Sequence, residues 1–262
     1  MSATSSGALQ RPVRSKARGW LAVSACVIVA QASFAQVSPQ RQPTTGTRNA
    51  VADTAEAARR VVVSTNEFRR QQNLPVTGHA PQLAIAARYF ADFMARTGKY
   101  GHSADGTEPA ARAKRFGYDY CIISENIAQL YRSDGIATTE LANRLFTGWQ
   151  DSPEHRKNML DPNVTETAVA IARSAKTDYY YAVQLFGRPT SQSIEFKVAN
   201  RAGVVVSYGL DGQTYQLPAR TTITHQVCKP AAVEFRGKTL QPVDGQQLVI
   251  VNDQNGVQLQ AQ

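Results

Sequence analysis

The sequence has few of the residues that mark catalytic and metal-binding centres. Only four of its 262 residues are histidine and three are cysteine. It contains neither the Gly-x-Ser-x-Gly turn of serine hydrolases nor the His-Glu-x-x-His helix of zinc proteases. These absences argue against both enzyme classes, and neither Cys121 nor Cys228 has the surroundings of a thiol-protease nucleophile.

The chain also lacks an apolar run of about 20 residues, the length that a helix needs to cross a bilayer. The run from Trp20 to Ala30 is too short, but it follows four basic residues and precedes the small residues around Ala35. This pattern predicts a signal peptide over residues 1–35 and therefore a secreted or periplasmic protein. A second interpretation is a lipoprotein anchored at Cys26, because Val23-Ser24-Ala25-Cys26 resembles a lipobox.

Negative charge is scarce relative to positive charge, and the full sequence carries a net charge of +9. The basic residues of the predicted signal peptide are Arg11, Arg14, Lys16 and Arg18, so removal of these four charges lowers the excess to +5. A modest positive charge favours anionic partners such as cell-wall polymers or lipid headgroups. No basic run with interleaved aromatic residues is present, so nucleic-acid binding is not expected.

Two cysteines, Cys121 and Cys228, remain after removal of the signal peptide. In an oxidising compartment they can form a disulfide that joins the two halves of the mature chain. Such a bridge would close a long loop and add roughly a few kcal/mol of stability in the chain-entropy model. Two separate buried thiols are the alternative.

The rest of the chain divides by composition. Residues 36–48 are rich in Gln, Pro, Thr and Ser, which predicts a flexible leader. Apolar residues at helical spacing and flanking Pro or Gly residues then predict a series of helices. These helices cover 49–73, 81–97, 109–116 and 138–150, with another turn opened by Ser152-Pro153-Glu154.

Strand-like patterns follow the helices. The runs 168–172 and 179–186 are separated by a polar turn and fit antiparallel pairing. After Arg188-Pro189, short β-prone runs alternate with turn signals such as Asp211-Gly212. Residues 190–262 therefore predict a small all-β module, one that is marginal as an isolated domain.

Three polar residues lie in sequence contexts that suggest a functional site. His102 lies in a Gly-rich loop, Glu125 interrupts an apolar run, and His155 follows the capped turn at Ser152. Two imidazoles and a carboxylate can form a metal site or an acid–base cluster if the fold brings them together. The residues alone equally allow a turn histidine, a carboxylate that caps backbone groups, and a histidine of a helix start.

Six short segments stand in one order along the chain. They are Asn66-Glu67-Phe68-Arg69, Leu83-Ala84-Ile85-Ala86-Ala87, Gly101-His102-Ser103 with Asp105-Gly106, Glu125-Asn126-Ile127, Ser152-Pro153-x-His155-Arg156-x-Asn158-x-Leu160 and Tyr181 to Gly187. In these segments the chain resembles the CAP superfamily (cysteine-rich secretory proteins, antigen 5, pathogenesis-related 1) in its bacterial secreted form. The resemblance runs from about Thr54 to Gly187, with Ser124 in place of the glycine of the family's Gly-Glu-Asn-Ile signature.

The resemblance implies an α+β fold. Residues 49–189 would form a CAP-like three-layer α-β-α sandwich, and residues 190–262 the C-terminal β module. Family members with two His and two Glu in one cavity imply that His102, Glu125 and His155 face each other here. Asp151 and Ser152 stand where the second Glu is expected, so no fourth ligand is assigned.

These residues support three functional hypotheses. The first is a binding protein for a lipid, a cell-wall fragment or a peptide, with His102, His155 and Glu125 holding a divalent cation such as zinc. The second is a hydrolase in which Glu125 is the general base or a metal activates water. The third makes the polar cluster structural and assigns partner recognition to the β module.

Supporting residues are expected around this cluster. Asn126, Gln184 and Ser152 would orient the His and Glu side chains. Asn66 and Arg69 would fix the first helix through local hydrogen bonds. His79 and His225 have no motif around them and are expected at the surface.

Overall fold

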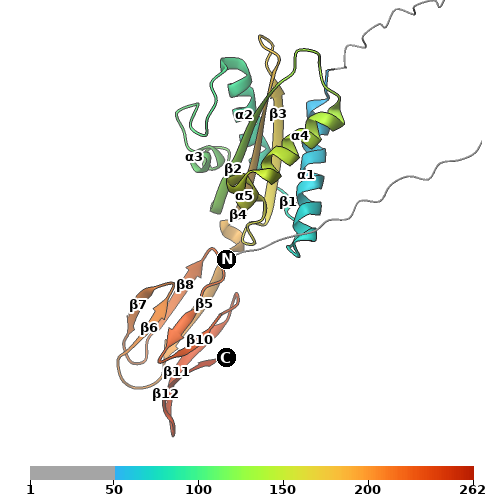
Figure 1. Cartoon of the computed structure of the whole chain (residues 1–262). Helices are drawn as coiled ribbons and strands as arrows, with labels where there is room; N and C mark the ends of the chain where they lie inside the picture. The colour runs from blue at the N-terminus through green and yellow to red at the C-terminus, as the bar shows by residue number, and fades with distance from the viewer. Residues whose placement is uncertain (1–50) are drawn as a thin grey trace, which may run out of the picture. The chain divides into compact units, whose positions relative to one another are not determined.

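The computed structural model of the protein describes residues 51–262 (Figure 1). The predicted signal peptide (1–35), the leader (36–48) and the lipobox at Cys26 lie outside these residues. Among the helices described, none is long and apolar enough to cross a bilayer.

The helices begin where the sequence provides a cap or a proline. α1 (Thr54–Gln71) follows Asp53, whose carboxylate accepts hydrogen bonds from the amides of Ala55 and Glu56 at 2.9 and 3.0 Å. Three others begin at a proline, which suits the first helical turn because its missing N–H would have no partner there. They are α2 (Pro81–Thr97), α3 (Pro109–Arg115) and α5 (Pro153–Met159). The remaining helix is α4 (Thr138–Asp151).

A four-stranded sheet lies between these helices, in the order β1-β3-β4-β2. Its strands are β1 (Gly78–His79), β2 (Tyr120–Tyr131), β3 (Glu166–Arg173) and β4 (Tyr179–Pro189). β4 pairs antiparallel with both β3 and β2, as predicted for the two runs at 168–172 and 179–186. β2 was not expected, because its polar centre breaks the alternation of a half-buried strand.

Each face of this sheet has its own apolar core. α2 and α3 pack on one face around Leu83 and Phe90, and α1, α4 and α5 pack on the other around Trp149 and Phe186. Figure 1 shows these helices on opposite sides of the strands. The α-β-α sandwich expected from the resemblance is therefore confirmed.

After Pro189 the chain forms only strands and a short 3₁₀ turn (Thr190–Gln192). These strands form two four-stranded sheets, in the orders β10-β9-β6-β7 and β12-β11-β5-β8. The two sheets share one apolar core that includes Phe196, Tyr208 and Ile250. The strands are β5 (Ile194–Asn200), β6 (Val206–Leu210), β7 (Gln213–Leu217), β8 (Thr222–Val227), β9 (Val233–Phe235), β10 (Lys238–Leu240), β11 (Gln247–Asp253) and β12 (Gly256–Ala261). The expectation of an all-β C-terminal region is confirmed.

The structure decides two further predictions, one about the pairing of Cys121 with Cys228 and one about the exposure of His225. Cys121 and Cys228 form a disulfide across a sequence separation of 107 residues, so the alternative of two free thiols is wrong. His225 is not a surface residue, since it is 7% exposed and hydrogen-bonds through Nε2 to the hydroxyl of Tyr208. Burial lowers the pKa of His225, which favours the neutral ring in this aromatic environment.

Candidate functional site

The candidate site is built around the middle of β2, which is an edge strand of the sheet. Successive side chains of a strand point to opposite faces, so Glu125 and Asn126 are presented to different helices. Glu125 faces α3 and the loop that carries His102, whereas Asn126 faces α5 and His155. One dipeptide of β2 therefore contacts both segments that contain the candidate histidines.

Glu125 has two cationic or polar partners. Arg112 of α3 donates from Nη2 to both carboxylate oxygens, at 3.0 and 2.8 Å. His102 donates from Nδ1 to Oε1 of the same carboxylate at 2.9 Å, and this hydrogen bond raises the pKa of His102. The side chains of Glu125 and Arg112 are each 1% exposed, while that of His102 is 48% exposed. The imidazole therefore reaches solvent while its partner carboxylate stays buried.

Arg112 is itself held from several sides. Its Nη1 donates to Asp105 Oδ1 at 3.0 Å and to the carbonyl of Thr107. Its guanidinium carbon lies 3.5 Å from the ring centroid of Phe90 on α2, a cation–π contact. The buried guanidinium therefore contacts two carboxylates and an aromatic face, which compensate its charge.

His155 is reached from the other face of β2. Asn126 donates from Nδ2 to the carbonyl oxygen of His155 at 3.1 Å, and Asn158 donates to Asn126 Oδ1 at 2.9 Å. Burial lowers the pKa of His155, and the positive charge of His102 lowers it further. The two imidazoles are thus within electrostatic reach, although in the described residues the buried Nδ1 of His155 has no hydrogen-bond partner.

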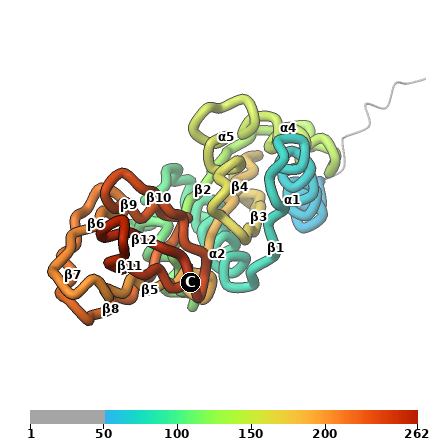
Figure 2. The backbone as a smooth tube through the Cα atoms, turned by 90° about the horizontal axis from the view of Figure 1, so that it is seen from below, coloured from blue at the N-terminus to red at the C-terminus, as the bar shows by residue number. Residues whose placement is uncertain are grey.

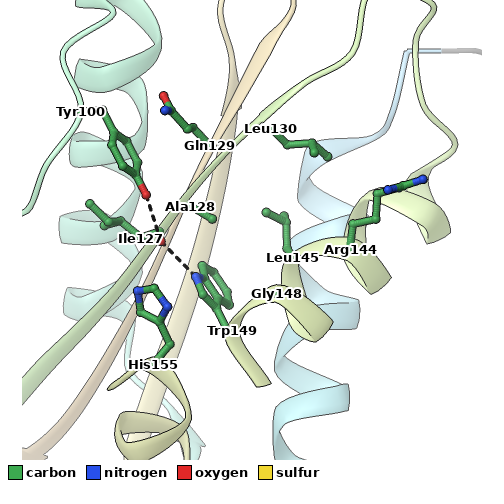
Figure 3. A pocket seen from close by; sticks show the side chains of 10 residues that line it. All are labelled: Tyr100, Ile127, Ala128, Gln129, Leu130, Arg144, Leu145, Gly148, Trp149 and His155. Carbon is green, nitrogen blue, oxygen red and sulfur yellow. Dashed lines mark hydrogen bonds between the residues drawn. The ribbon is translucent and has the colours of Figure 1, made fainter. Parts of the chain in front are cut away.

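A cavity of about 320 Å³ opens beside His155 (Figure 3). One wall is β2 from Ile127 to Leu130, and the other is α4, which contributes Leu145, Gly148 and Trp149. The carbonyl oxygen of Ile127 accepts hydrogen bonds from Tyr100 Oη at 3.3 Å and Trp149 Nε1 at 3.1 Å. His155 places a ring at a hollow whose walls are otherwise mostly apolar, whereas Arg144 at its margin points its guanidinium away and pairs with Glu140 at 2.8 Å.

The three predicted ligands do not form a complete set of metal donors in this arrangement. Within residues 51–262, no group of three or more His, Cys, Asp or Glu side chains is placed to hold an ion. Arg112 occupies both oxygens of Glu125, and a guanidinium and a divalent cation compete for the same lone pairs. The residues therefore do not fit a zinc ion without a rearrangement of Arg112.

The supporting residues fall in different places. Of the three expected to orient the His and Glu side chains, only Asn126 contacts one of these residues, and it does so at the backbone of His155. Gln184 donates to Thr65 Oγ1 of α1 at 3.1 Å instead. Ser152 sits at the N-cap position of α5, but its side chain makes no capping hydrogen bond.

Asn66 and Arg69 act over longer distances than predicted. Asn66 hydrogen-bonds to the backbone of Thr77, and Arg69 donates to the carbonyl oxygens of Met159 and Asp161 at 2.8 and 2.9 Å. Asn66 ties α1 to the segment before β1, whereas Arg69 ties it to the end of α5 and the residues that follow, so these hydrogen bonds are not local to the first helix.

Sequence reasoning missed Arg112 altogether. A carboxylate in an apolar run needs a partner, which was a usable signal, but the chain offers 29 Lys and Arg residues. Arg112 lies on a short helix with other basic residues, Lys114 and Arg115, a pattern that normally indicates a solvated face.

Comparison with known proteins places the site in context. Residues 64–186 match the model of the cysteine-rich secretory protein family, CAP. An uncharacterised protein of Bacillus subtilis, YkwD, is 30% identical over 134 residues, which is 51% of this chain. The chain spans about half the length of that relative, 49%.

Solved structures give similar coverage at lower identity. An outer surface protein of Borrelia burgdorferi is 19% identical with a TM-score of 0.46, over 54% of this chain and 98% of that one. An extracellular SCP-domain protein of Bacillus anthracis is 23% identical with a TM-score of 0.43, over 52% of this chain and 41% of that one. A cysteine-rich secretory protein of Staphylococcus aureus is 18% identical with a TM-score of 0.39, over 53% and 40%.

Proposed function

The chain belongs to the CAP family of cysteine-rich secretory proteins through residues 64–186, and we propose that it is an exported protein whose CAP domain binds a lipid-type ligand. The ligand would have an apolar body and an anionic or hydrogen-bonding end. An exported location agrees with the predicted signal peptide and with the extracellular and outer-surface descriptions of similar bacterial proteins.

The cavity between β2 and α4 is the observation that carries this proposal. Its volume, about 320 Å³, lies at the lower end of the range for small-molecule pockets. Ile127, Leu145 and Trp149 offer apolar surface, while Gln129 and His155 offer hydrogen-bonding groups and Arg144, paired with Glu140, lies at the margin. That combination suits an acyl chain with a carboxylate or phosphate better than a fully polar cell-wall sugar.

Gly148 provides a direct test. A Cβ added at Gly148 would meet no heavy atom within 4 Å, so a larger side chain can start there without a backbone clash, and we expect Gly148→Phe to occupy part of the hollow that Gly148 lines. The matched control is Thr147→Phe on the neighbouring exposed position of α4, which does not line the cavity. Binding of a dansyl-labelled C12 fatty acid to the full chain is measured by fluorescence.

We expect the probe to bind the unchanged chain and the Thr147→Phe variant, and to lose most of its affinity for Gly148→Phe. Equal binding by all three proteins would place the probe elsewhere and overturn the proposal. A third outcome is that the fatty acid binds none of the three proteins. If a muropeptide or a peptide then binds the unchanged chain and Gly148→Phe abolishes that binding, the cavity belongs to that other ligand class.

A hydrolase is the second candidate, and the contact between His102 and Glu125 favours it. A carboxylate on Nδ1 fixes the tautomer of the ring and leaves Nε2 for proton transfer. Because Arg112 binds both oxygens of Glu125, the base in this arrangement would be His102, with Glu125 as its positioning residue. This differs from the general base expected from the sequence.

Kinetics with a simple ester such as p-nitrophenyl butyrate tests the hydrolase. His102→Gln should abolish turnover, and Glu125→Gln should shift its pH profile, whereas Thr147→Phe should change neither. Turnover that survives His102→Gln would exclude this mechanism while leaving the ligand-binding proposal intact.

A further inference from the structure

The outer edge of β3 is only partly covered. β1 pairs with β3 in parallel register at Gly78–Glu166 and His79–Thr167, and it goes no further because α2 begins at Pro81. β3 continues to Arg173. Figure 2 shows β1 as a short segment beside β3. Within residues 51–262, no other strand pairs with this edge of the sheet.

The backbone groups on this edge can be assigned from the alternation of an antiparallel pair. The amide of Ser174 donates to the carbonyl of Tyr179 at 2.9 Å, so even-numbered residues of β3 bond to β4. Odd-numbered residues then point their N–H and C=O groups away from β4. Just before β3, Thr165 O accepts from the amide of Gly78 at 2.8 Å while the amide of Thr165 donates to Gly187 of β4 at 2.9 Å, so the alternation applies from Glu166 onward. The backbone groups of Val169 and Ile171 therefore face the edge beyond β1, where Val169 is half-buried and Ile171, whose carbonyl Arg88 covers, is 1% exposed.

This edge forms one side of a cavity of about 280 Å³, which we call the β3-edge groove. It is lined by Thr54, Ala55, Ala58, Arg59 and Val62 of α1, His79 of β1, Ala84 and Arg88 of α2, and Ala168 to Ile171 of β3. Alanines on both helices leave the space between them unfilled, because their side chains are small. The groove lies at the sheet edge opposite β2 and its cavity.

The charges around the groove are predominantly positive. Its lining includes Arg59 and Arg88 and no carboxylate. Glu56 is shared by Arg59 and Arg60, and Asp92 pairs with Arg88, so the surrounding acids do not match the bases. An anionic occupant is therefore favoured over a cationic one.

We propose that the β3-edge groove binds an extended acidic peptide, which pairs with β3 as an added strand. The backbone of Val169 and Ile171 supplies the hydrogen bonds, and the arginines select acidic side chains on alternate positions of the peptide. Arg88 already donates from Nη1 to the carbonyl of Ile171 at 3.3 Å, so its half-exposed side chain moves aside on binding.

A guard role for Arg88 is the competing explanation. Charged side chains at an open edge prevent unwanted strand pairing. The two roles predict opposite effects of Arg88→Gln. Removal of a guard would strengthen peptide binding, whereas removal of a selecting charge would weaken it for an acidic peptide.

The test uses the full chain and a rhodamine-labelled, acetylated and amidated hexapeptide of alternating Glu and Val, followed by fluorescence anisotropy. The matched control peptide alternates Lys and Val. Val169→Pro removes one edge N–H without touching the ladder to β4, and is checked for folding by circular dichroism. Two further peptides are N-methylated, one at the odd-numbered and the other at the even-numbered residues. Only one of these sets directs its N–H groups toward β3 in a paired strand, so the two peptides test strand pairing on the unchanged protein.

We expect the acidic peptide to bind, and Val169→Pro and one of the two N-methylated peptides to weaken binding by about tenfold or more. The other N-methylated peptide should bind like the parent, and Arg88→Gln should bind more weakly. If Val169→Pro fails to fold, the N-methylated pair decides the question alone.

Four outcomes would overturn the proposal. They are no binding up to about 1 mM peptide, equal affinity for the Lys peptide, equal loss or no loss for both N-methylated peptides, and tighter binding by Arg88→Gln. A concentration-dependent dimer, seen by sedimentation and lost in Val169→Pro, would assign the edge to a second copy of the chain instead.

Discussion

Arg112 holds both carboxylate oxygens of Glu125, with Nη2 at 3.0 Å from Oε1 and 2.8 Å from Oε2. The pair lies in the interior, and His102 is hydrogen-bonded to the same carboxylate at the protein surface. The buried ion pair therefore positions the exposed imidazole of His102 through its hydrogen bond to Glu125. It also changes the role of Glu125 from a free base or ligand to a fixed partner of Arg112 and His102.

The ion pair should be costly to break from one side. Arg112→Gln leaves a buried carboxylate without its main partner, and we expect the free energy of unfolding to fall by about 3–5 kcal/mol. Urea unfolding of the full chain measures this. The control Lys114→Gln, on an exposed position of the same helix, should stay within about 0.5 kcal/mol of the unchanged chain. Similar losses in both variants would show that Arg112 contributes no more than a surface residue.

The two candidate histidines should titrate on opposite sides of the ordinary pKa of 6.5. The hydrogen bond to Glu125 raises the pKa of His102, and burial lowers the pKa of His155. His102 therefore contributes stability that is fully present below pH 6.5 and is lost as the pH rises through its raised folded pKa. His155 acts in the reverse sense, because the unfolded chain takes up a proton first as the pH falls below 6.5.

Ring signals in two-dimensional NMR give both titrations directly. In Glu125→Gln the pKa of His102 should move back down, while the exposed control Glu140→Gln should leave it unchanged. A His102 signal that titrates below that of His155 in the unchanged chain would contradict the hydrogen bond to Glu125.

Zinc should not bind the unchanged chain stoichiometrically, because Arg112 competes for the lone pairs of Glu125 and the described residues offer no three-donor cluster. Calorimetric titration with zinc alone measures this, with Arg112→Gln as the variant that frees the carboxylate. Tight binding by the unchanged chain that disappears in a His102→Ala, His155→Ala double variant would restore the metal site predicted from the sequence.

The disulfide should be a large contribution to stability. It closes a loop over a sequence separation of 107 residues, for which the chain-entropy model gives about 4–5 kcal/mol. The Cys121→Ser, Cys228→Ser double variant should unfold at lower denaturant concentration by that amount. A reducing agent should destabilise the unchanged chain and leave the double variant unaffected. No difference between oxidised and reduced protein would contradict this role.

Much of the local structure was predictable because its causes are local. Proline at the first helical position marks the starts of α2 and α3, and the spacing of apolar residues defines the face that α2 buries. The β2 strand was missed for an equally physical reason. Helices cover both faces near Glu125 and Asn126, so buried polar partners replaced the apolar alternation that signals a strand.

The site was only partly predictable. The motifs pointed to His102, Glu125 and His155, and the structure brings His102 into contact with Glu125. They did not point to Arg112, and they assigned Gln184 to the wrong neighbours, since it bonds to Thr65. Such partners depend on which helix packs over which strand.

The sequence by itself determined the family, the order of the helices, the all-β character of the C-terminal region and the residues around which a site could form. These follow from motif order and from short-range spacing, which the chain carries wherever it folds. Only the tertiary structure decided that Arg112 occupies the carboxylate of Glu125, that Cys121 bonds to Cys228, and that the edge of β3 is left open beyond β1. Each of these depends on packing between segments far apart in the chain, where no local preference specifies the partner.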